Sequence, residues 1–272
     1  MKKFNILITG CSHGGIGYVT AVYLRDLGHR VFASARQQKD VNALNAEGFE
    51  TYLIDVTNYE HIDNALDDIL QKTNGTLDVV FNNAGFGQAG ALEDIETKHL
   101  KEQFETNVFG LHNLTVKALK IMRKQGYGKI IQHSSVLGLI AMKYRGAYNA
   151  SKYAVEGLAD TMRLELKGSD IYMSTLNTGP ITSKFRENSL KTIKNVEFEK
   201  SAHKLQYEKI LAGKHKKVPF NEPAISVAKI VEKIINSNKP KPRYYITKAT
   251  IIMAIFKRVL PSKLMDTFLS KY

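Results

Sequence analysis

The chain is 272 residues long, which suits one large domain that can bury a sizeable core. Its hydrophobic content of 43% and charged content of 24% are ordinary for a soluble globular protein. The single cysteine, Cys11, excludes a disulfide framework and predicts a reducing, cytoplasmic setting. No stretch approaches the ~18 to 20 apolar residues of a membrane span, and the apolar run after Met1-Lys2-Lys3 is too short for a secretory signal.

The net charge of +13 is unevenly placed. Residues 1–183 hold 19 basic and 19 acidic side chains, whereas residues 184–272 hold 20 basic and 7 acidic ones. This asymmetry indicates that the C-terminal third faces something anionic: lipid headgroups, a phosphorylated substrate or nucleic acid. Lysines scattered over solvated helix faces would give the same count. We expect no nucleic acid, because the aromatic platforms and recognition motifs of such proteins are missing.

A glycine-rich turn near the N-terminus is the first functional signal. It runs from Thr9 to Gly17, between a predicted strand over residues 4–8 and an amphipathic helix that continues to Leu27. Glycines in this context let the backbone approach a pyrophosphate, which the N-terminus of the helix favours electrostatically. The turn therefore predicts a dinucleotide site formed by Gly10, Ser12, Gly14, Gly15, Ile16 and Gly17.

The second predicted strand, residues 30–35, ends at Arg36. An acidic residue at this point would accept hydrogen bonds from the ribose 2′-hydroxyl of NAD, and none is present. Arg36 instead offers a positive fork to a 2′-phosphate. We therefore expect NADP as the cofactor rather than NAD. The alternative is that Arg36 is a solvent-facing turn residue.

Strands and helices continue to alternate along the chain. Further strands are predicted at residues 51–54, 77–81, 128–133 and 171–176, with helices at 59–73, at 97–124 and after Tyr148. This alternation predicts an α/β fold: a doubly wound parallel sheet of the Rossmann type, in three layers. Ligands of such sheets bind at the carboxyl ends of the strands, where the motifs named here fall.

Tyr148 and Lys152 are the best candidates for acid–base chemistry. They stand four residues apart at the start of an amphipathic run, so they share one face of a helix. A phenol titrates near ~10, and we expect the neighbouring ammonium to lower that pKa toward neutrality, as a general acid–base catalyst requires. The pair is a weak signal on its own, because the chain has 13 tyrosines.

The alternation ends after Gly179-Pro180. Residues 184–217 form a lysine-rich excursion with a predicted helix around 197–212, which we interpret as a substrate-binding loop region beyond the core at 1–183. A helix at 223–235 and a strand at 244–246 follow. The tail, 249–272, contains two basic amphipathic segments. We expect these segments to contact a lipid-like substrate or a membrane, or to pack on the body or on a partner subunit. No domain boundary is apparent, so residues 1–272 are predicted to be one domain.

Together these residues resemble the short-chain dehydrogenase/reductase family over residues 4–185. The matching elements are Thr9-Gly10, Gly15-Ile16-Gly17, Asp55, Asn82-Asn83-Ala84-Gly85, Asn107, Ser135, Tyr148, Lys152 and Gly179-Pro180-Ile181.

The resemblance implies a catalytic role for each matching side chain. Tyr148 is implied to be the acid–base, and Lys152 to lower its pKa and bind the nicotinamide ribose. Ser135, 13 positions before Tyr148, is implied to bind the substrate oxygen. Ser134 is expected to point elsewhere, because side chains alternate along a strand. Asn107 is implied to hold a water in a proton relay behind Lys152.

The resemblance also implies cofactor contacts beyond the glycine turn. Asp55 and Val56 are implied to contact adenine, and backbone at Ile181 to hold the nicotinamide carboxamide. Ser183 stands where the family more often has threonine, and its hydroxyl is expected to substitute. The wall beside the adenine ribose is implied for Asn82 to Gly85, and Pro180 is a further implied contact.

One departure concerns the glycine turn, which has four residues between Thr-Gly and Gly-x-Gly instead of three. We expect Gly14 to absorb the extra residue by adopting a positive φ. The longer pattern around this turn and Asp55-Val56-Thr57 is similar to 1-acyldihydroxyacetone-phosphate reductases. Gly-Pro-Ile with the basic tail is similar to 17β-hydroxysteroid and retinol dehydrogenases. Both likenesses imply apolar or lipid-like substrates.

The predicted function is therefore an NADP(H)-dependent oxidoreductase that interconverts a ketone or aldehyde with an alcohol. We expect a hydrophobic small-molecule substrate, a homo-dimer or homo-tetramer, and no bound metal. The alternative is a redox-sensing module that binds NADP without turnover. The Tyr148, Lys152, Ser135 and Asn107 set argues against a sensor, which needs no proton donor.

Overall fold

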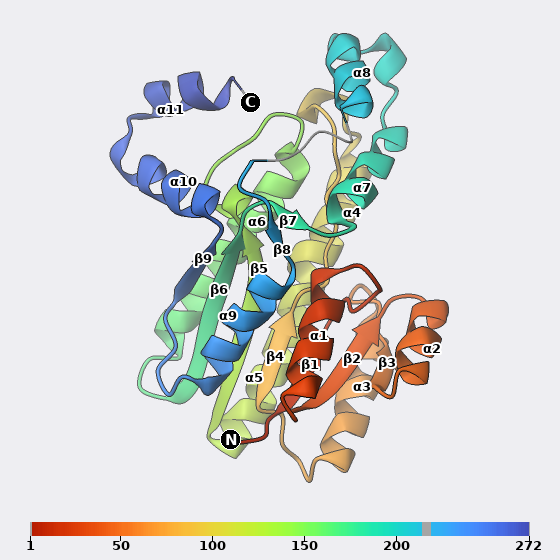
Figure 1. Ribbon diagram of the computed structural model, residues 1–272, viewed down its shortest axis with the longest axis vertical. Coiled ribbons are helices and arrows are strands. Elements are labelled where there is room, and N and C mark those ends of the chain that lie inside the picture. The colour runs from red at the N-terminus through yellow and green to blue at the C-terminus, as the bar shows by residue number, and fades with distance from the viewer. Residues whose placement is uncertain (1, 214–218, 272) are drawn as a thin grey trace.

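Seven parallel strands form the central sheet in the computed structural model, which describes residues 2–213 and 219–271 (Figure 1). Their order across the sheet is β3-β2-β1-β4-β5-β6-β9. The chain reverses direction across the sheet between β1 and β4, which creates the switch point where doubly wound sheets bind ligands. The predicted α/β Rossmann-type fold is confirmed. The strands are β1 (Asn5–Ile8), β2 (Arg30–Ala35), β3 (Glu50–Leu53), β4 (Val79–Asn82), β5 (Tyr127–Ser135), β6 (Asp170–Thr178) and β9 (Arg243–Ile246).

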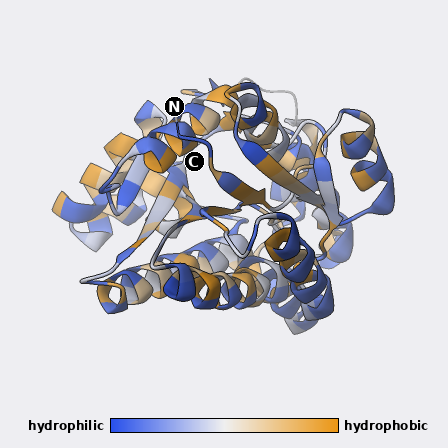
Figure 2. Cartoon of the chain, turned by 90° about the horizontal axis from the view of Figure 1, so that it is seen from below, coloured by the Kyte–Doolittle hydropathy of each residue, from blue (hydrophilic) through white to orange (hydrophobic). Residues whose placement is uncertain are grey.

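Helices cover both faces of this sheet, because the strands bury side chains on both. In β1, Ile6 and Ile8 join one hydrophobic cluster while Leu7 joins the other. One face packs against α1 (Ile16–Asp26), α2 (Gln38–Ala46) and α9 (Ile225–Asn236). The other packs against α3 (Tyr59–Lys72), α5 (Leu111–Gln125) and α6 (Gly146–Glu165). Figure 2 shows hydrophobic and hydrophilic residues alternating along these helices, as amphipathic helices require.

The C-terminal third rises above the carboxyl ends of the strands in two separate arms (Figure 1). One arm contains α7 (Phe185–Lys191) and α8 (Lys204–Ala212), and the other contains α10 (Lys248–Val259) and α11 (Ser262–Leu269). A two-stranded parallel sheet of β7 (Ile181–Thr182) and β8 (Glu222–Pro223) joins the base of the first arm to the segment before α9. Within residues 2–213 and 219–271, no helix is long and apolar enough to cross a membrane.

Shorter elements complete the chain. Helix α4 (Thr97–Phe104) runs directly into a π-helical turn, η2 (Glu105–Gly110), and then into α5. Such π-turns often lie at functional sites, and this one carries Asn107. The 3₁₀ turns are η1 (Leu92–Asp94), η3 (Val136–Gly138), η4 (Thr192–Asn195) and η5 (Phe198–Lys200).

Several sequence predictions need correction. Helix α2 is absent from them, because its mostly polar sequence buries only Val41 and Leu44. The helix predicted at 223–235 begins instead at Ile225, since Pro223 pairs with Thr182 in the small sheet. The helix predicted around 197–212 is divided into η5 and α8 by Ser201, whose hydroxyl bonds Asp94 and the amide of His203. Residues 214–217 of the predicted substrate-loop region and Tyr272 of the tail lie outside the described residues.

Candidate active site

Tyr148, Ser135 and Lys152 come together at the carboxyl end of β5. Ser135 is the last residue of β5, and α6 carries the other two on one face. All three are buried, with 8%, 6% and 5% of their surface exposed, in the order named. The Ser135 hydroxyl accepts from the Leu137 amide at 3.1 Å and is near enough to the Tyr148 phenol to lower its pKa. The Lys152 Nζ lies 5.6 Å from the centre of the Tyr148 ring.

The Lys152 ammonium is held by the strand beside it. Its Nζ donates to the carbonyl oxygen of His133 at 2.6 Å. Burial lowers the pKa of Lys152 to about 8, and the negative charge of Glu156 opposes that shift. Glu156 is itself bonded by the Asn177 amide at 2.6 Å and by Arg243 at 3.0 Å. The cation of the pair therefore belongs to a buried network that spans α6, β5, β6 and β9.

Burial also sets the proton affinity of Tyr148, and the expectation that Lys152 lowers this pKa toward neutrality is wrong. Burial raises the pKa of the phenol to about 12, while the hydrogen bond with Ser135 and the charge of Arg145 lower it in part. The Lys152 ammonium lies over the ring and donates to His133. The phenol is therefore fully protonated at neutral pH, which is the state needed to give a proton.

Asn107 lies next to this group but bonds the backbone of a loop. Its Oδ1 accepts from the Phe86 amide at 3.0 Å, and its Nδ2 donates to the Phe86 carbonyl at 2.9 Å. A third bond, at 3.2 Å, reaches the Ser151 hydroxyl. Asn107 thus clamps the chain that follows Gly85. Its implied role in holding a water stays a prediction.

The glycine turn has the backbone that a dinucleotide needs. Gly14 has a φ of +78°, as the extra residue requires. A Cβ on Gly17 would come within 2.5 Å of the Gly10 carbonyl oxygen, so only glycine lets α1 pack this close to β1. Gly15 caps α1 with no side-chain hydrogen bond, which leaves the first amides of the helix to an external anion. The turn therefore fits a pyrophosphate, with Ile16 as the first helical residue.

A cavity of about 500 Å³ opens beside this turn. The segment after β6 forms its far wall, including the predicted contact Ser183. The Ser183 hydroxyl accepts from the Phe185 amide, and the Lys184 amide donates to the Gly14 carbonyl at 3.0 Å. Pro180 and Ile181 pair with β8 just below. The structure therefore brings the Gly-Pro-Ile segment against the glycine turn.

The ends of β2 and β3 present the next predicted contacts. Arg36 is exposed directly after β2, and no acceptor among the described residues holds its guanidinium. The Ser12 hydroxyl of the turn donates to Asp40 at 2.8 Å. Asp55 accepts from the amide and hydroxyl of Thr57, at 3.0 and 2.8 Å, and Val56 is buried.

The prediction for Asn82 needs correction at the side chain. Its amide points into the interior, where it donates to Thr115 and Gln132, because the side chains of β4 alternate between the two faces of the sheet. The neighbouring Asn83, in the same implied wall, donates to the carbonyls of Thr9 and Gly10 at 2.8 and 3.1 Å. Asn83 therefore shapes the glycine turn.

The backbone of Ala84 and Gly85 lies between the glycine turn and Asn107. The Ala84 amide donates to the Thr9 hydroxyl at 3.0 Å, and a Cβ on Gly85 would lie 3.0 Å from the Asn107 Oδ1. His133, missed as a site residue, contacts Asn83 at 2.9 Å and Thr178 at 3.2 Å. Burial, with the charge of Lys152, lowers the pKa of His133 to about 3. No sequence pattern points to His133, since one histidine inside a strand is not distinctive.

Apolar side chains wall the space next to Tyr148. Leu137, Ile140 and Met265 form a cluster with the Tyr148 ring, and Met253 and Phe256 of α10 pack against it. On the opposite arm, the Phe185 ring lies 5.3 Å from the Tyr148 ring. The described part of the chain holds no group of three or more His, Cys, Asp or Glu side chains able to bind a metal.

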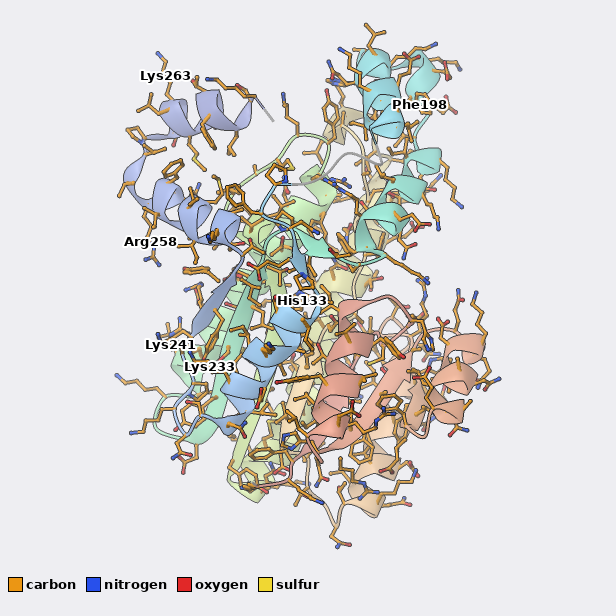
Figure 3. All side chains as sticks on the ribbon, in the orientation of Figure 1. His133, Phe198, Lys233, Lys241, Arg258 and Lys263 are labelled. Atoms are coloured by element: carbon orange, nitrogen blue, oxygen red, sulfur yellow. The ribbon has the colours of Figure 1, made fainter. Side chains whose placement is uncertain are left out.

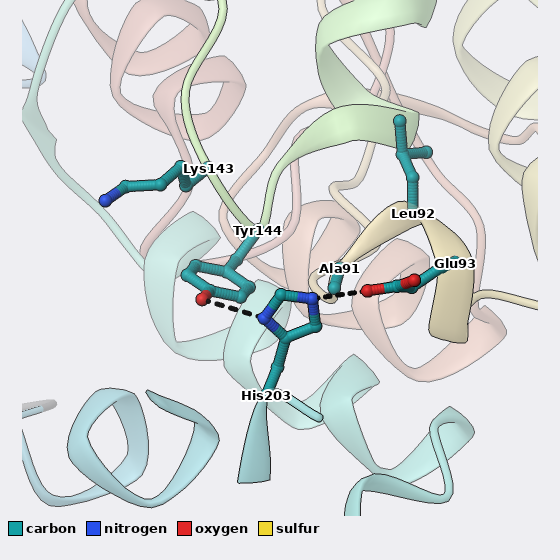
Figure 4. A pocket seen from close by; sticks show the side chains of 6 residues that line it. All are labelled: Ala91, Leu92, Glu93, Lys143, Tyr144 and His203. Carbon is teal, nitrogen blue, oxygen red and sulfur yellow. Dashed lines mark hydrogen bonds and ion pairs between the residues drawn. The ribbon is translucent and has the colours of Figure 1, made fainter. Parts of the chain in front are cut away.

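A second pocket, of about 330 Å³, lies apart from the predicted residues (Figure 4). His203 crosses it, with one ring nitrogen 3.2 Å from the Tyr144 hydroxyl and the other 2.6 Å from the Glu93 carboxylate. These contacts join α8 to η1 and to the loop before α6. The pocket therefore lies between the start of α8, η1 and the loop before α6.

The family model described as short chain dehydrogenase matches residues 5–194. The Escherichia coli protein called uncharacterized oxidoreductase YbbO is 38% identical, with 99% of this chain and 94% of that protein covered. The NADPH-dependent 1-acyldihydroxyacetone phosphate reductase of Schizosaccharomyces pombe is 28% identical over 77% of this chain and 70% of its own length. Retinol dehydrogenase 8 of Bos taurus is 30% identical, with 88% of this chain and 80% of that protein covered. The resemblances stated from the sequence are confirmed.

Solved structures share the fold. ElxO with NADP bound superposes with a TM-score of 0.72 at 25% identity, covering 90% of this chain and 96% of that chain.

The pKa of Lys152 can be tested directly by following the chemical shift of the lysine ε-carbons in isotope-labelled protein. One resonance should titrate near pH 8, well below the ordinary lysine value of 10.5, and should be missing from Lys152→Met. In Glu156→Gln it should titrate at still lower pH, because the Glu156 charge raises this pKa. A Lys152 resonance that titrates with the surface lysines would contradict the burial of the ammonium.

Proposed function

The chain belongs to the short-chain dehydrogenase/reductase family, and we propose that it is an NADP(H)-dependent enzyme that interconverts a ketone or aldehyde with an alcohol on an apolar, lipid-like substrate. Membership of the family makes it an oxidoreductase acting on CH–OH groups of small molecules. The observation that carries the proposal is the convergence of the Tyr148 phenol, the Ser135 hydroxyl and the Lys152 ammonium beside the glycine turn.

In the proposed mechanism, NADPH held at the glycine turn would supply the hydride that reduces the carbonyl carbon. The Ser135 hydroxyl donates to the carbonyl oxygen and orients it toward Tyr148. The phenol then gives its proton to this oxygen as negative charge develops there. Lys152 holds positive charge beside the resulting phenolate, which the buried setting would otherwise disfavour. The phenol is protonated at neutral pH, as this proton transfer to the carbonyl oxygen requires.

NADP is proposed over NAD on two grounds. Arg36 leaves its guanidinium available at the end of β2, where a nucleotide 2′-phosphate would need it. ElxO, of the same fold, has NADP bound, and the Schizosaccharomyces pombe relative is NADPH-dependent. The turn itself accepts the pyrophosphate through the free amides of α1.

The apolar substrate is proposed from the walls of the site. Side chains from η3, α10 and α11 surround one side of the Tyr148 ring, and Phe185 covers the other. Such walls bind hydrocarbon and exclude water. The substrates named for the yeast and bovine relatives, an acyl ketone phosphate and retinol, are lipid-like as well.

Tyr148→Phe should abolish ketone reduction while NADPH binding stays nearly intact. Losing a general acid costs about 10²- to 10⁴-fold in rate, and the ring packing is kept. NADPH oxidation with a panel of long-chain ketones measures turnover, and fluorescence titration measures binding. A variant that keeps a tenth of the rate would count against Tyr148. Tight NADPH binding by the wild type without turnover of any ketone would instead favour a redox sensor.

Arg36→Asp should shift the cofactor preference toward NADH. The variant loses the charge-assisted bond between the guanidinium and the 2′-phosphate, and its carboxylate repels that phosphate. NADPH should therefore bind about 10- to 100-fold more weakly. Parallel titrations with NADPH and NADH measure the ratio of the two dissociation constants. Arg123→Asp, an exposed substitution at the opposite end of the sheet, is the matched control. An unchanged ratio in Arg36→Asp would show that Arg36 does not select the cofactor.

We further propose that the outer face of α10 and α11 contacts an anionic membrane surface. Ile251, Ile255 and Val259 are 46%, 54% and 66% exposed on α10, and Arg258 and Lys263 point away from the body (Figure 3). Apolar residues flanked by basic ones are typical of interfacial helices. The family commonly forms oligomers, and a homo-dimer or homo-tetramer is the competing use of this face.

Ile255→Glu with Val259→Glu should abolish sedimentation with vesicles that contain phosphatidylserine, because each carboxylate meets the same anionic surface. Wild-type binding should weaken with salt and fail on vesicles of phosphatidylcholine alone. Leu205→Glu, at an equally exposed site on α8, is the control. If the double variant leaves vesicle binding intact, or instead splits an oligomer on gel filtration, the face does not serve a membrane.

A further inference from the structure

Arg145 is a cation beside Tyr148 that has no carboxylate partner. It immediately precedes α6, one turn before Tyr148, and its side chain is partly buried. The single hydrogen bond recorded for its guanidinium goes to the hydroxyl of Ser189, a neutral group on α7. No carboxylate among residues 2–213 and 219–271 lies within ion-pair distance of it. A partly buried guanidinium without a counter-charge is costly, so it needs a functional explanation.

The position of the guanidinium follows from its neighbours. A Cβ added to Gly87 would lie 3.3 Å from the Ser189 hydroxyl and 3.4 Å from the Tyr148 ring, so these two groups face the same point of the loop. The guanidinium that bonds Ser189 is therefore beside the phenol. Its charge accordingly acts on Tyr148. It lies between α6 and α7, on the side of the phenol that the Phe185 ring covers.

The charges around this point are positive. Arg186, exposed on α7, is a second cation, and its charge lowers the pKa of Arg145. The neighbouring acid, Glu187, is already bonded to Lys191 at 2.7 Å. The first amides of the 20-residue α6 add the positive end of a helix dipole. Two guanidiniums and a helix N-terminus without a carboxylate form a region that favours an anion.

We propose that Arg145 and Arg186 form an anion subsite that binds a carboxylate or phosphate of the substrate, a few bonds from the carbonyl that reacts at Tyr148. A planar guanidinium binds either group through two parallel hydrogen bonds, and Ser189 orients the Arg145 fork. This inference rests on the proposed function and narrows its substrate class to anionic keto compounds with an apolar chain. The chain lies along the wall formed by α10 and α11.

Matched ketones test the subsite by turnover. The pairs are 4-oxodecanoate with its methyl ester, and decanoyl-dihydroxyacetone phosphate with decanoyl-dihydroxyacetone. Wild type should prefer the charged member, and the preferred pair tells carboxylate from phosphate. In Arg145→Gln, kcat/KM for the charged member should fall about 10- to 100-fold, while the neutral member changes little. For the charged member, kcat/KM of Arg145→Lys should lie between those of wild type and Arg145→Gln. Arg123→Gln, the control, should match wild type.

Calorimetric titration of the same ketones into protein saturated with NADP⁺ measures binding without turnover. Discrimination that is present in wild type and lost in Arg145→Gln supports the subsite, even if no ketone is reduced, in which case the proposed function alone fails. Equal binding of charged and neutral members by wild type overturns the subsite. So does an equal loss for both in Arg145→Gln, which would mark a structural role. If that variant does not fold, Arg186→Gln, at an exposed position, should show the same selective loss to a smaller degree.

Discussion

The hydrogen bond from the Lys152 ammonium to the His133 carbonyl is the interaction on which the site depends. This bond joins α6 to β5 two residues before Ser135. It therefore fixes the position of the Tyr148 phenol relative to the Ser135 hydroxyl. A buried ammonium is costly without a counter-charge, and Glu156 supplies one from the next turn of the helix. Arg243 and Asn177 then hold Glu156, which ties the outermost strand of the sheet to the catalytic helix. The site is thus anchored by the strands beneath it.

Burial acts on the protonation state of both members of this pair. It raises the pKa of Tyr148 to about 12 and lowers that of Lys152 to about 8, so both shifts favour the uncharged side chain. A protonated phenol is ready to reduce a carbonyl, because the alkoxide that forms is a stronger base than the phenolate. The reverse reaction needs the phenolate, which this setting disfavours unless positive charge is near. Lys152 is the cation placed over the ring to supply it.

Local patterns predicted much of this arrangement, because they depend on residues close in sequence. The alternation of strands and helices, the glycine turn with its positive φ at Gly14, and the shared face of Tyr148 and Lys152 are of this kind. The errors come from contacts between distant segments. The pKa of Tyr148 depends on its burial by side chains from several elements. The direction of the Asn82 side chain depends on the face of β4 from which it projects. The interest of Arg145 comes from the absence of a carboxylate partner among the described residues. None of these can be read from spacing.

The C-terminal third, where the excess of positive charge lies, approaches Tyr148 from two sides. Helix α7 brings Phe185, Arg186 and Ser189, and the α10–α11 arm brings Met265 and its neighbours. The first side is polar and cationic around Arg145, while the second is apolar. The proposed anionic keto substrate would contact both sides, with its carbonyl between an anionic head and a hydrocarbon chain. The proposed substrate would therefore use both the charge and the apolar surface that residues 184–272 bring to the Tyr148 phenol.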